Sequence, residues 1–286
     1  MDLEGELGVI AAEHGGAGEP VLHPTRTDVV VLRRGEVVVK AHSRRDDAEA
    51  LRLRLRVRAA ASAALSGVML PPLRPDVLTV AGRAVTVWPT GMPVAQDELD
   101  SAPWEEGARL LARLHAVPLT LVPPLPEAGG PARAARAVRR MPGDGPVEGL
   151  LRRAFAELPA PEPMPGLLTH GDWHLGQLVR RDRWLLIDVD DLGVGDPAWD
   201  LARPAAWYAA GLLDPAIWER FVGAYLAFGG PALGDGSDPW RRLDLPARAV
   251  TIQLAAVAVV NAGRDGRELD DVEHSLVEAC NRIVRA

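Results

Sequence analysis

The hydrophobic pattern of this chain changes once along its length, near residue 90, and that change limits the folds that it can adopt. Before this point, β-branched runs come in pairs joined by short turns that contain glycine, which is the pattern of β-hairpins. The paired runs are residues 28–32 with 36–40, and residues 77–80 with 84–87. After this point, apolar residues recur at helical spacing. We therefore expect an α+β fold of two lobes, a small β-rich N-terminal lobe (residues 1–90) and a larger helical C-terminal lobe (residues 91–286).

Helical spacing, strong helix formers and capping residues mark the expected helices. Their expected positions are residues 7–13, 46–66, 104–115, 132–140, 147–157, 199–211, 215–228, 246–262 and 270–285. Residues 46–66 also fit a strand, because leucines alternate there with arginines. We favour a helix, since Asp46 with Glu49 forms a helix-start signal. We interpret residues 89–93 as a linker between the lobes.

The composition excludes several classes of protein. With 48% hydrophobic and 25% charged residues, the chain is not intrinsically disordered. Its longest apolar run, residues 254–260, is shorter than the ~20 residues of a membrane helix, and its acidic start is unlike a signal peptide. A net charge of −7 argues against nonspecific nucleic-acid binding, and Cys280, the single cysteine, cannot form an internal disulfide. We expect a cytoplasmic protein that binds neither nucleic acid nor a membrane.

The basic residues are distributed very unevenly between the two types. Lys40 is the only lysine among 32 basic residues, and the rest are arginine. A nucleotide bias in the gene explains the heavy use of arginine. Lysine differs in offering a compact point charge on a slim stem, whereas arginine carries a planar fork. Lys40 is therefore a candidate functional residue, although a surface lysine at the end of a strand fits the same position.

Residues 167–202 contain the densest group of side chains that can carry chemistry. A polar turn, HGDWH, holds Asp172, and Gln177 follows five residues later. An expected strand at residues 184–187 then ends at Asp188, with two more aspartates just beyond. Carboxylate and amide oxygens suit Mg²⁺, and an aspartate near such a site can accept a proton from an attacking hydroxyl. This segment therefore predicts a magnesium site beside a general base.

Phosphoryl transfer requires parts of this kind: a lysine on the phosphates, an acid that holds magnesium, a second oxygen ligand and a base. In protein kinases the base precedes the amide ligand by five residues, as Asp172 precedes Gln177 here. Kinases also carry the lysine on a strand and its glutamate partner on the following helix, an order that Lys40 and Glu49 share. The spacing favours a kinase-like reaction.

In these segments the sequence resembles the aminoglycoside phosphotransferase family, which has a protein-kinase-like fold. The motifs that carry the resemblance are HGDWHLGQ, IDVDDLGVGDPAWDLA, GARLLARLHAVP and, more weakly, VVVKA. The ending HLGQ is also similar to the branch that contains bacterial maltokinases and glucosamine kinases. The resemblance implies a kinase that uses ATP and Mg²⁺ to phosphorylate a hydroxyl of a small molecule, either an aminoglycoside or a sugar or aminosugar.

The resemblance also implies a role for each motif residue. Asp172 would be the catalytic base and Asp188 the magnesium-binding acid, with Gln177 as the second metal ligand. Lys40 would bind the α and β phosphates and pair with Glu49. The hinge that faces the adenine would be formed by Val87, Trp88 and Pro89, and the residues with structural roles would be Asp196 and Asp200.

Two features depart from the family pattern. Gln177 stands where the family usually has asparagine, so its amide lies one methylene further out. Residues 23–28, where a loop is expected to cover the phosphates, contain no glycine. Both departures leave room for a catalytically silent relative that binds nucleotide or another ligand.

Other readings of the same residues stay open. A metal-dependent hydrolase would use His170, Asp172, His174 and Asp188. Against a zinc motif, Gly171 stands where H-E-x-x-H requires glutamate. Glu49 is equally well explained as a helix-capping residue. The acidic residues at 265–273 fit a solvated helix start as well as a site for a cationic substrate.

Overall fold

The structure, a computed structural model, describes residues 2–25, 28–95, 100–162 and 164–285. Contacts within the chain divide it into two compact units. Unit 1 consists of Met1–Ala102, Val117–Pro126 and Gly176–Leu192, and unit 2 consists of Pro103–Ala116, Glu127–Leu175 and Gly193–Ala286. The fold is α+β, with a five-stranded sheet in the N-terminal part of the chain and mostly helices in the C-terminal part. A domain boundary at residue 90 stays a prediction.

Unit 1 is built on an antiparallel sheet with the strand order β1-β2-β3-β5-β4. The strands are β1 (Val21–His23), β2 (Val30–Arg34), β3 (Val37–Ala41), β4 (Leu78–Val80) and β5 (Arg83–Pro89). Both predicted hairpins are confirmed, because β2 pairs with β3 and β4 with β5. The turn between β2 and β3 requires Gly35, whose φ is 54° and whose Cβ, if present, would lie 2.8 Å from the carbonyl oxygen of Ala17.

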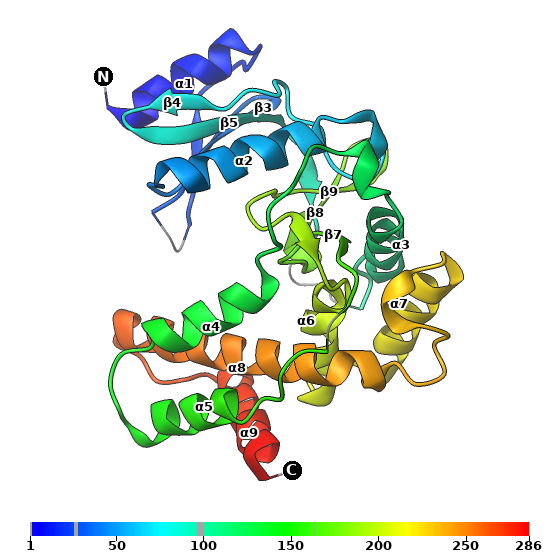
Figure 1. Ribbon diagram of the computed structural model, residues 1–286. Helices are drawn as coiled ribbons and strands as arrows, with labels where there is room; N and C mark the ends of the chain where they lie inside the picture. The colour runs from blue at the N-terminus through cyan, green and yellow to red at the C-terminus, as the bar shows by residue number, and fades with distance from the viewer. Residues whose placement is uncertain (1, 26–27, 96–99, 163, 286) are drawn as a thin grey trace. The chain divides into compact units, whose positions relative to one another are not determined.

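The alternation of side chains gives β3 one apolar face and one face that carries a charge. Val39 and Ala41 belong to the apolar core that α1 (Leu3–Glu13) covers (Figure 1). Lys40 lies between them in the sequence and so on the opposite face, where the strand register pairs it with Thr86 of β5. The sheet therefore holds the single lysine on a rigid element, away from the core under α1.

The helix α2 (Asp47–Ala60) confirms the predicted helix, and the alternative strand is wrong. Asp46 caps it, because its side chain accepts a 2.8 Å hydrogen bond from the N–H of Glu49. The buried Arg56 on α2 donates a 2.7 Å hydrogen bond to the carbonyl of Leu192. Helix-forming composition and the cap thus outweigh the alternation of leucine and arginine.

A second, three-stranded sheet in unit 1 has the order β6-β8-β9. Its strands are β6 (Met92–Pro93), β8 (Leu178–Arg180) and β9 (Trp184–Leu186). The strand expected at residues 184–187 is confirmed. The linker expected at residues 89–93 is wrong in part, because β5 extends to Pro89 and β6 pairs with β8. Proline is compatible with both places because each is at the end of a strand.

Unit 2 is mostly helical, and each of its longer helices overlaps a predicted one. They are α3 (Trp104–His115), α4 (Gly130–Arg140), α5 (Pro146–Ala156), α6 (Ala198–Ala209), α7 (Pro215–Ala227), α8 (Trp240–Asp265) and α9 (Asp271–Arg285). The prediction missed the first residues of α8, which begins at Trp240 rather than at Pro246. Proline is favoured in the first turn of a helix, so the sequence placed the start there, but here packing keeps the preceding turn helical.

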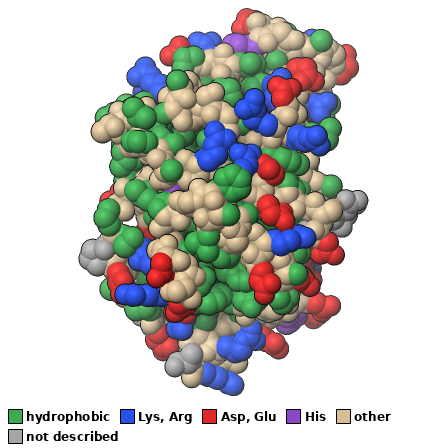
Figure 2. All heavy atoms as spheres, turned by 90° about the vertical axis from the view of Figure 1, so that its right-hand side faces the viewer, with side chains coloured by type: hydrophobic (Ala, Val, Ile, Leu, Met, Phe, Trp, Pro, Cys, Tyr) green, Lys and Arg blue, Asp and Glu red, His purple; other side chains and the backbone are tan. Residues whose placement is uncertain are grey.

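The helix α8 is long and apolar enough to cross a membrane, judged by length and composition alone. Its apolar surface has other partners in unit 2, because α8 packs against α4, α5, α6 and α9 (Figure 1). Most of its apolar stretch is buried, as in the central helix of a globular domain. On the face shown in Figure 2, basic and acidic side chains are interspersed, and neither sign forms a continuous field.

The motif HGDWH begins directly after a short strand of unit 2. That strand, β7 (Leu167–Thr169), pairs with β10 (Gly193–Gly195). The carboxylate of Asp200 on α6 accepts hydrogen bonds from the N–H of His170 at 2.6 Å and from the N–H of Gly171 at 2.7 Å. Asp200 thus fixes the backbone immediately before Asp172 and has the structural role expected of it.

Asp200 is itself held by a buried chain of polar groups. The Nε2 atom of His115 lies 2.9 Å from Asp200 Oδ2, and His115 Nδ1 lies 2.8 Å from the hydroxyl of Tyr225. The same hydroxyl accepts a hydrogen bond from the N–H of Ala232. Burial opposes ionisation of Asp200, but hydrogen bonding to His115 and to His170 outweighs it and lowers the pKa of Asp200. Three helices therefore share one anchor for the loop that holds Asp172.

We predict that Asp200→Asn lowers the free energy of unfolding by about 3 kcal/mol, because the new amide group presents donors where three donors already converge. Urea denaturation at neutral pH measures this loss. Asp214→Asn is the matched control: Asp214 caps α7 from an exposed position, and asparagine caps equally well. Equal stability of the two variants would contradict the anchoring role of Asp200.

Candidate active site

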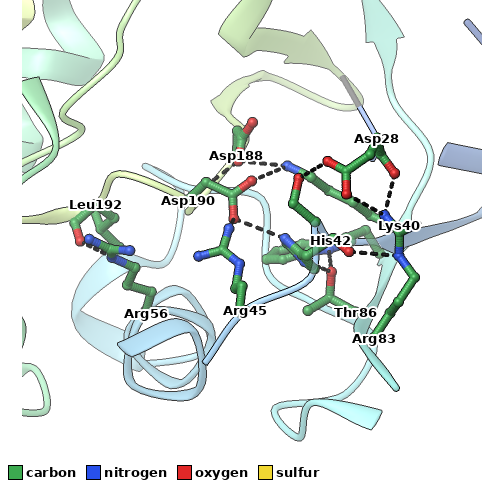
Figure 3. A network of polar contacts seen from close by, with 12 residues as sticks. Asp28, Lys40, His42, Arg45, Arg56, Arg83, Thr86, Asp188, Asp190 and Leu192 are labelled. Atoms are coloured by element: carbon green, nitrogen blue, oxygen red, sulfur yellow. Dashed lines mark hydrogen bonds and ion pairs between the residues drawn. The ribbon is translucent and has the colours of Figure 1, made fainter. Parts of the chain in front are cut away.

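Lys40 and Asp188 lie 148 positions apart in the sequence, and the fold of unit 1 joins them. The ammonium nitrogen of Lys40 lies 2.9 Å from Asp188 Oδ1 and 2.8 Å from Asp190 Oδ2 (Figure 3). Asp188 follows β9 with a φ of 65°, a left-handed conformation that aspartate adopts more readily than most residues. This turn places two carboxylates of one loop on the same lysine.

Attraction between opposite charges determines the ionisation of Lys40 and the two aspartates, despite their burial. Burial disfavours the ammonium of Lys40, but the carboxylates of Asp188 and Asp190 outweigh it and raise the lysine's pKa. Burial likewise disfavours both carboxylates, and Lys40 outweighs it and lowers the pKa of each. All three groups are therefore ionised at neutral pH, and the cluster formed by Lys40, Asp188 and Asp190 carries a net negative charge.

Asp190 has two further partners that sequence reasoning missed. Arg45 donates a 2.8 Å hydrogen bond to its Oδ1 atom, and His42 Nδ1 lies 2.9 Å from the same oxygen (Figure 3). Burial lowers the pKa of His42, so its ring is neutral at neutral pH. Nδ1 then carries the proton, since the carboxylate of Asp190 can only accept. The sequence offers one weak signal for His42, its place two residues after Lys40 on the same face.

The neutral ring of His42 connects the acidic loop to the predicted hinge. Its Nε2 atom accepts a hydrogen bond from the hydroxyl of Thr86 at 2.9 Å, and Trp88 Nε1 donates to that hydroxyl at 2.8 Å. The three hinge residues Val87, Trp88 and Pro89 end β5 opposite residues 37–39 of β3. The carbonyl of Val87 accepts a hydrogen bond from the N–H of Leu73. Their contact with an adenine stays a prediction.

The structure does not bring Glu49 to Lys40. Glu49 is exposed in the first turn of α2, and among the ion pairs of the described residues Lys40 meets only the two aspartates. The region around α2 reaches the acidic loop through Arg45 and Arg56 instead. The capping explanation of Glu49 accounts for its position, and a role toward a cofactor stays a prediction.

Gln177 lies next to the turn that carries Asp188. Its carbonyl accepts a 2.9 Å hydrogen bond from the N–H of Ile187, the residue before Asp188, and its side chain is buried. No three His, Cys, Asp or Glu side chains form a metal cluster in the part of the chain that the structure describes. The set of Asp188, Asp190 and Gln177 still fits Mg²⁺, which takes one or two carboxylates and completes its shell with water and phosphate oxygens.

Asp172 lies in unit 2 and forms ion pairs with two arginines. Arg133 of α4 donates to its Oδ2 atom at 2.7 Å, and Arg203 of α6 to its Oδ1 atom at 3.1 Å. Sequence reasoning missed both arginines, which lie more than 30 positions from Asp172 on two separate helices. These three side chains line one pocket, together with Trp199, Gln253 and others. The loop expected over the phosphates includes residues 26–27, which lie outside the described residues.

Comparisons with known proteins identify the family of this chain and the structures that it resembles. A family model described as the phosphotransferase enzyme family matches residues 24–244. No curated protein matches the sequence.

Similar solved structures include a choline/ethanolamine kinase family protein from Mesorhizobium loti, with 16% identity, a TM-score of 0.64 and coverage of 99% of this chain and 94% of that chain. A thermostable mutant of aminoglycoside phosphotransferase APH(4)-Ia has 16% identity, a TM-score of 0.65 and coverage of 98% of both chains. Spectinomycin phosphotransferase APH(9)-Ia, in complex with ADP and spectinomycin, has 11% identity, a TM-score of 0.60 and coverage of 100% and 99%. These likenesses show a fold shared with small-molecule kinases. The family match, which covers most of the chain, shows that this protein belongs to the phosphotransferase enzyme family.

Proposed function

We propose that this enzyme transfers the γ-phosphate of ATP to a hydroxyl group of a small molecule, with Mg²⁺ as cofactor. The observation that carries the proposal is the cluster of Lys40, Asp188 and Asp190, in which one cation and two hard oxygen ligands converge from a strand and a loop. Phosphoryl transfer requires these groups. The family match favours this reaction over the metal-dependent hydrolysis that the sequence alone leaves open.

The predicted metal and phosphate ligands have distinct roles in the proposal. Asp188 and Gln177, joined by Asp190, would hold Mg²⁺, and the metal would neutralise charge on the phosphates. Lys40 would exchange one carboxylate for phosphate oxygens, a change for which its slim stem and point charge are suited. The nucleotide is proposed to be ATP because a related phosphotransferase binds ADP.

Asp172 would take the proton of the acceptor hydroxyl. The Asp200 anchor supports this role, because it fixes the two residues before Asp172. The acceptor class implied by the resemblance is an aminoglycoside or a sugar or aminosugar. A cytoplasmic location completes the proposal, because ATP is supplied there.

We predict that Lys40→Arg gives a folded protein with at least tenfold lower kcat. The wider guanidinium cannot occupy the same gap between two carboxylates and phosphates, and misplacement by about 1 Å can cost ~10²-fold in rate. Steady-state release of ADP measures the effect. Arg181→Lys, the reverse exchange in an exposed turn, is the control and should leave kcat unchanged. Full activity of Lys40→Arg would mean that Lys40 contributes only its charge.

We predict that Asp172→Asn lowers kcat by ~10²–10⁴-fold, because asparagine keeps the shape but cannot accept the proton. Calorimetric titration should show an affinity for ATP with Mg²⁺ close to that of the wild type, since Asp172 is assigned to the acceptor. Asp182→Asn, in the exposed β8–β9 turn, is the control. A kcat of Asp172→Asn within a few-fold of wild type would remove Asp172 from the role of base.

A further inference from the structure

Two guanidinium groups hold the residue that the proposed function assigns as the base. Each oxygen of the Asp172 carboxylate has its own arginine, Arg133 on one side and Arg203 on the other. In this pairing a charged donor lies on each oxygen, which leaves fewer lone pairs of the carboxylate free for a substrate hydroxyl. An acceptor that draws one arginine away therefore frees an oxygen of Asp172 to receive the proton.

The charge of the pocket indicates which kind of acceptor can draw an arginine away from Asp172. Of the described residues that line it, Arg133 and Arg203 are basic and Asp172 is acidic, and the others are uncharged, which leaves a net positive charge. Burial lowers the pKa of Arg203, which shows that its guanidinium is poorly solvated, and the Asp172 carboxylate compensates for this loss. A cationic acceptor would compete for Asp172 while facing two arginines, whereas an anionic acceptor would provide a second partner for them.

The remaining lining groups suit a small polar ligand. Trp173 is buried, and its Nε1 atom has no hydrogen-bond partner among the described residues. A buried donor without an acceptor is costly, so a ligand or water oxygen is expected there. Gln253 adds an amide to the wall, and Trp199 an aromatic face. The cavity itself has a volume of about 20 Å³, room for roughly one water molecule, so the arginines must move aside to admit an acceptor.

We propose that the acceptor of this kinase is a small anionic polyol, which bears a carboxylate or phosphate beside the hydroxyl that is phosphorylated. Arg133 and Arg203 bind that anion, and the exchange frees one oxygen of Asp172. The proposal rests on the proposed function and narrows its acceptor class from aminoglycosides and neutral or amino sugars to acidic ones.

The reaction balances with these groups. The acceptor hydroxyl oxygen forms a bond to the γ-phosphorus of ATP, and the bond from that phosphorus to the β–γ bridging oxygen breaks. ADP leaves with the electron pair of the broken bond, and the hydroxyl proton passes to Asp172. In this scheme binding of the acceptor anion is what makes the base available, so acceptors without an anion are poor substrates even when they fit.

Matched acceptors test the proposal. The acidic probes are gluconate, galacturonate, glycerate and glucose 6-phosphate, and the comparison set is glucose, galactose, glycerol, glucosamine and galactosamine. ADP release gives kcat/KM for each, and calorimetric titration without ATP gives the affinity. At least one acidic probe should bind more tightly than its uncharged counterpart and exceed it at least tenfold in kcat/KM. Comparing the kcat/KM and affinity of the carboxylate probes with those of glucose 6-phosphate then shows whether the arginines prefer a carboxylate or a phosphate.

Variants assign the preference to the two arginines. Arg133→Gln and Arg203→Gln should each lower the ratio of kcat/KM for the acidic over the uncharged member at least fivefold. Arg140→Gln removes the same charge from an exposed position of α4 and should leave the ratio unchanged. Preference for uncharged or amino members, in binding or in turnover, would overturn the proposal, as would a ratio that the two variants do not change.

A failure of the proposed function would give a different result from a failure of the anionic-acceptor proposal. It would appear as a melting temperature that does not rise with millimolar ATP and Mg²⁺ in the wild type, whichever acceptor is present. If ATP with Mg²⁺ stabilises the protein while uncharged or amino acceptors are preferred, the kinase assignment stands and only the anionic acceptor is wrong.

Discussion

The contact of one ammonium group with two carboxylates is the interaction on which the catalytic proposal depends. Lys40 meets Asp188 and Asp190 in a partly buried place, where an unpaired charge would be costly. The loop that carries both aspartates is held by several side chains at once. Arg45 and His42 bind Asp190, and Arg56 binds the carbonyl at Leu192. Removing Lys40 would leave two adjacent carboxylates facing each other.

A second anchor of the same kind organises the loop of unit 2. Asp200, His115 and Tyr225 form a buried chain of hydrogen bonds that ends on the backbone beside Asp172. The supporting groups around both loops, such as Arg45 in unit 1 and His115 in unit 2, carry no role in the proposed chemistry themselves. Since a reacting group must be held closely for efficient catalysis, such supporting residues determine how well Lys40 and Asp172 can act.

Most of the fold could be predicted from the sequence because its signals are local. Period-2 runs around glycine turns gave the two hairpins, and amphipathic spacing gave the helices of unit 2 to within a few residues. The family resemblance assigned Lys40 and Asp188 to one site, but it paired Lys40 with Glu49 and not with Asp188. What could not be predicted are contacts between distant elements. Arg133 and Arg203 reach Asp172 from two helices, and nothing in their spacing marks them among 31 arginines.

Glu49 shows a different case, in which one local motif fits two roles. Its place at the start of a helix fits a kinase glutamate, yet in the structure Glu49 is exposed in the first turn of α2, where its N–H donates to the capping side chain of Asp46. Arginines take over the contact to the acidic loop in this chain. At Arg45 and Arg56 arginine therefore has a structural role that a nucleotide bias alone does not explain. Its long side chain and planar fork can reach and hydrogen-bond a carboxylate or a carbonyl.

The central claim, that Lys40 faces the phosphates of the nucleotide, is tested most directly by an acyl-phosphate derivative of ATP. Such a reagent acylates an amine that lies beside its phosphates, and high effective concentration offsets the low fraction of free amine. Because Lys40 is the only lysine, mass spectrometry can assign the product without ambiguity. The account predicts acylation of Lys40 that requires Mg²⁺ and is blocked by excess ATP. Acylation confined to the N-terminal amine, or labelling of Lys40 that excess ATP does not reduce, would contradict it.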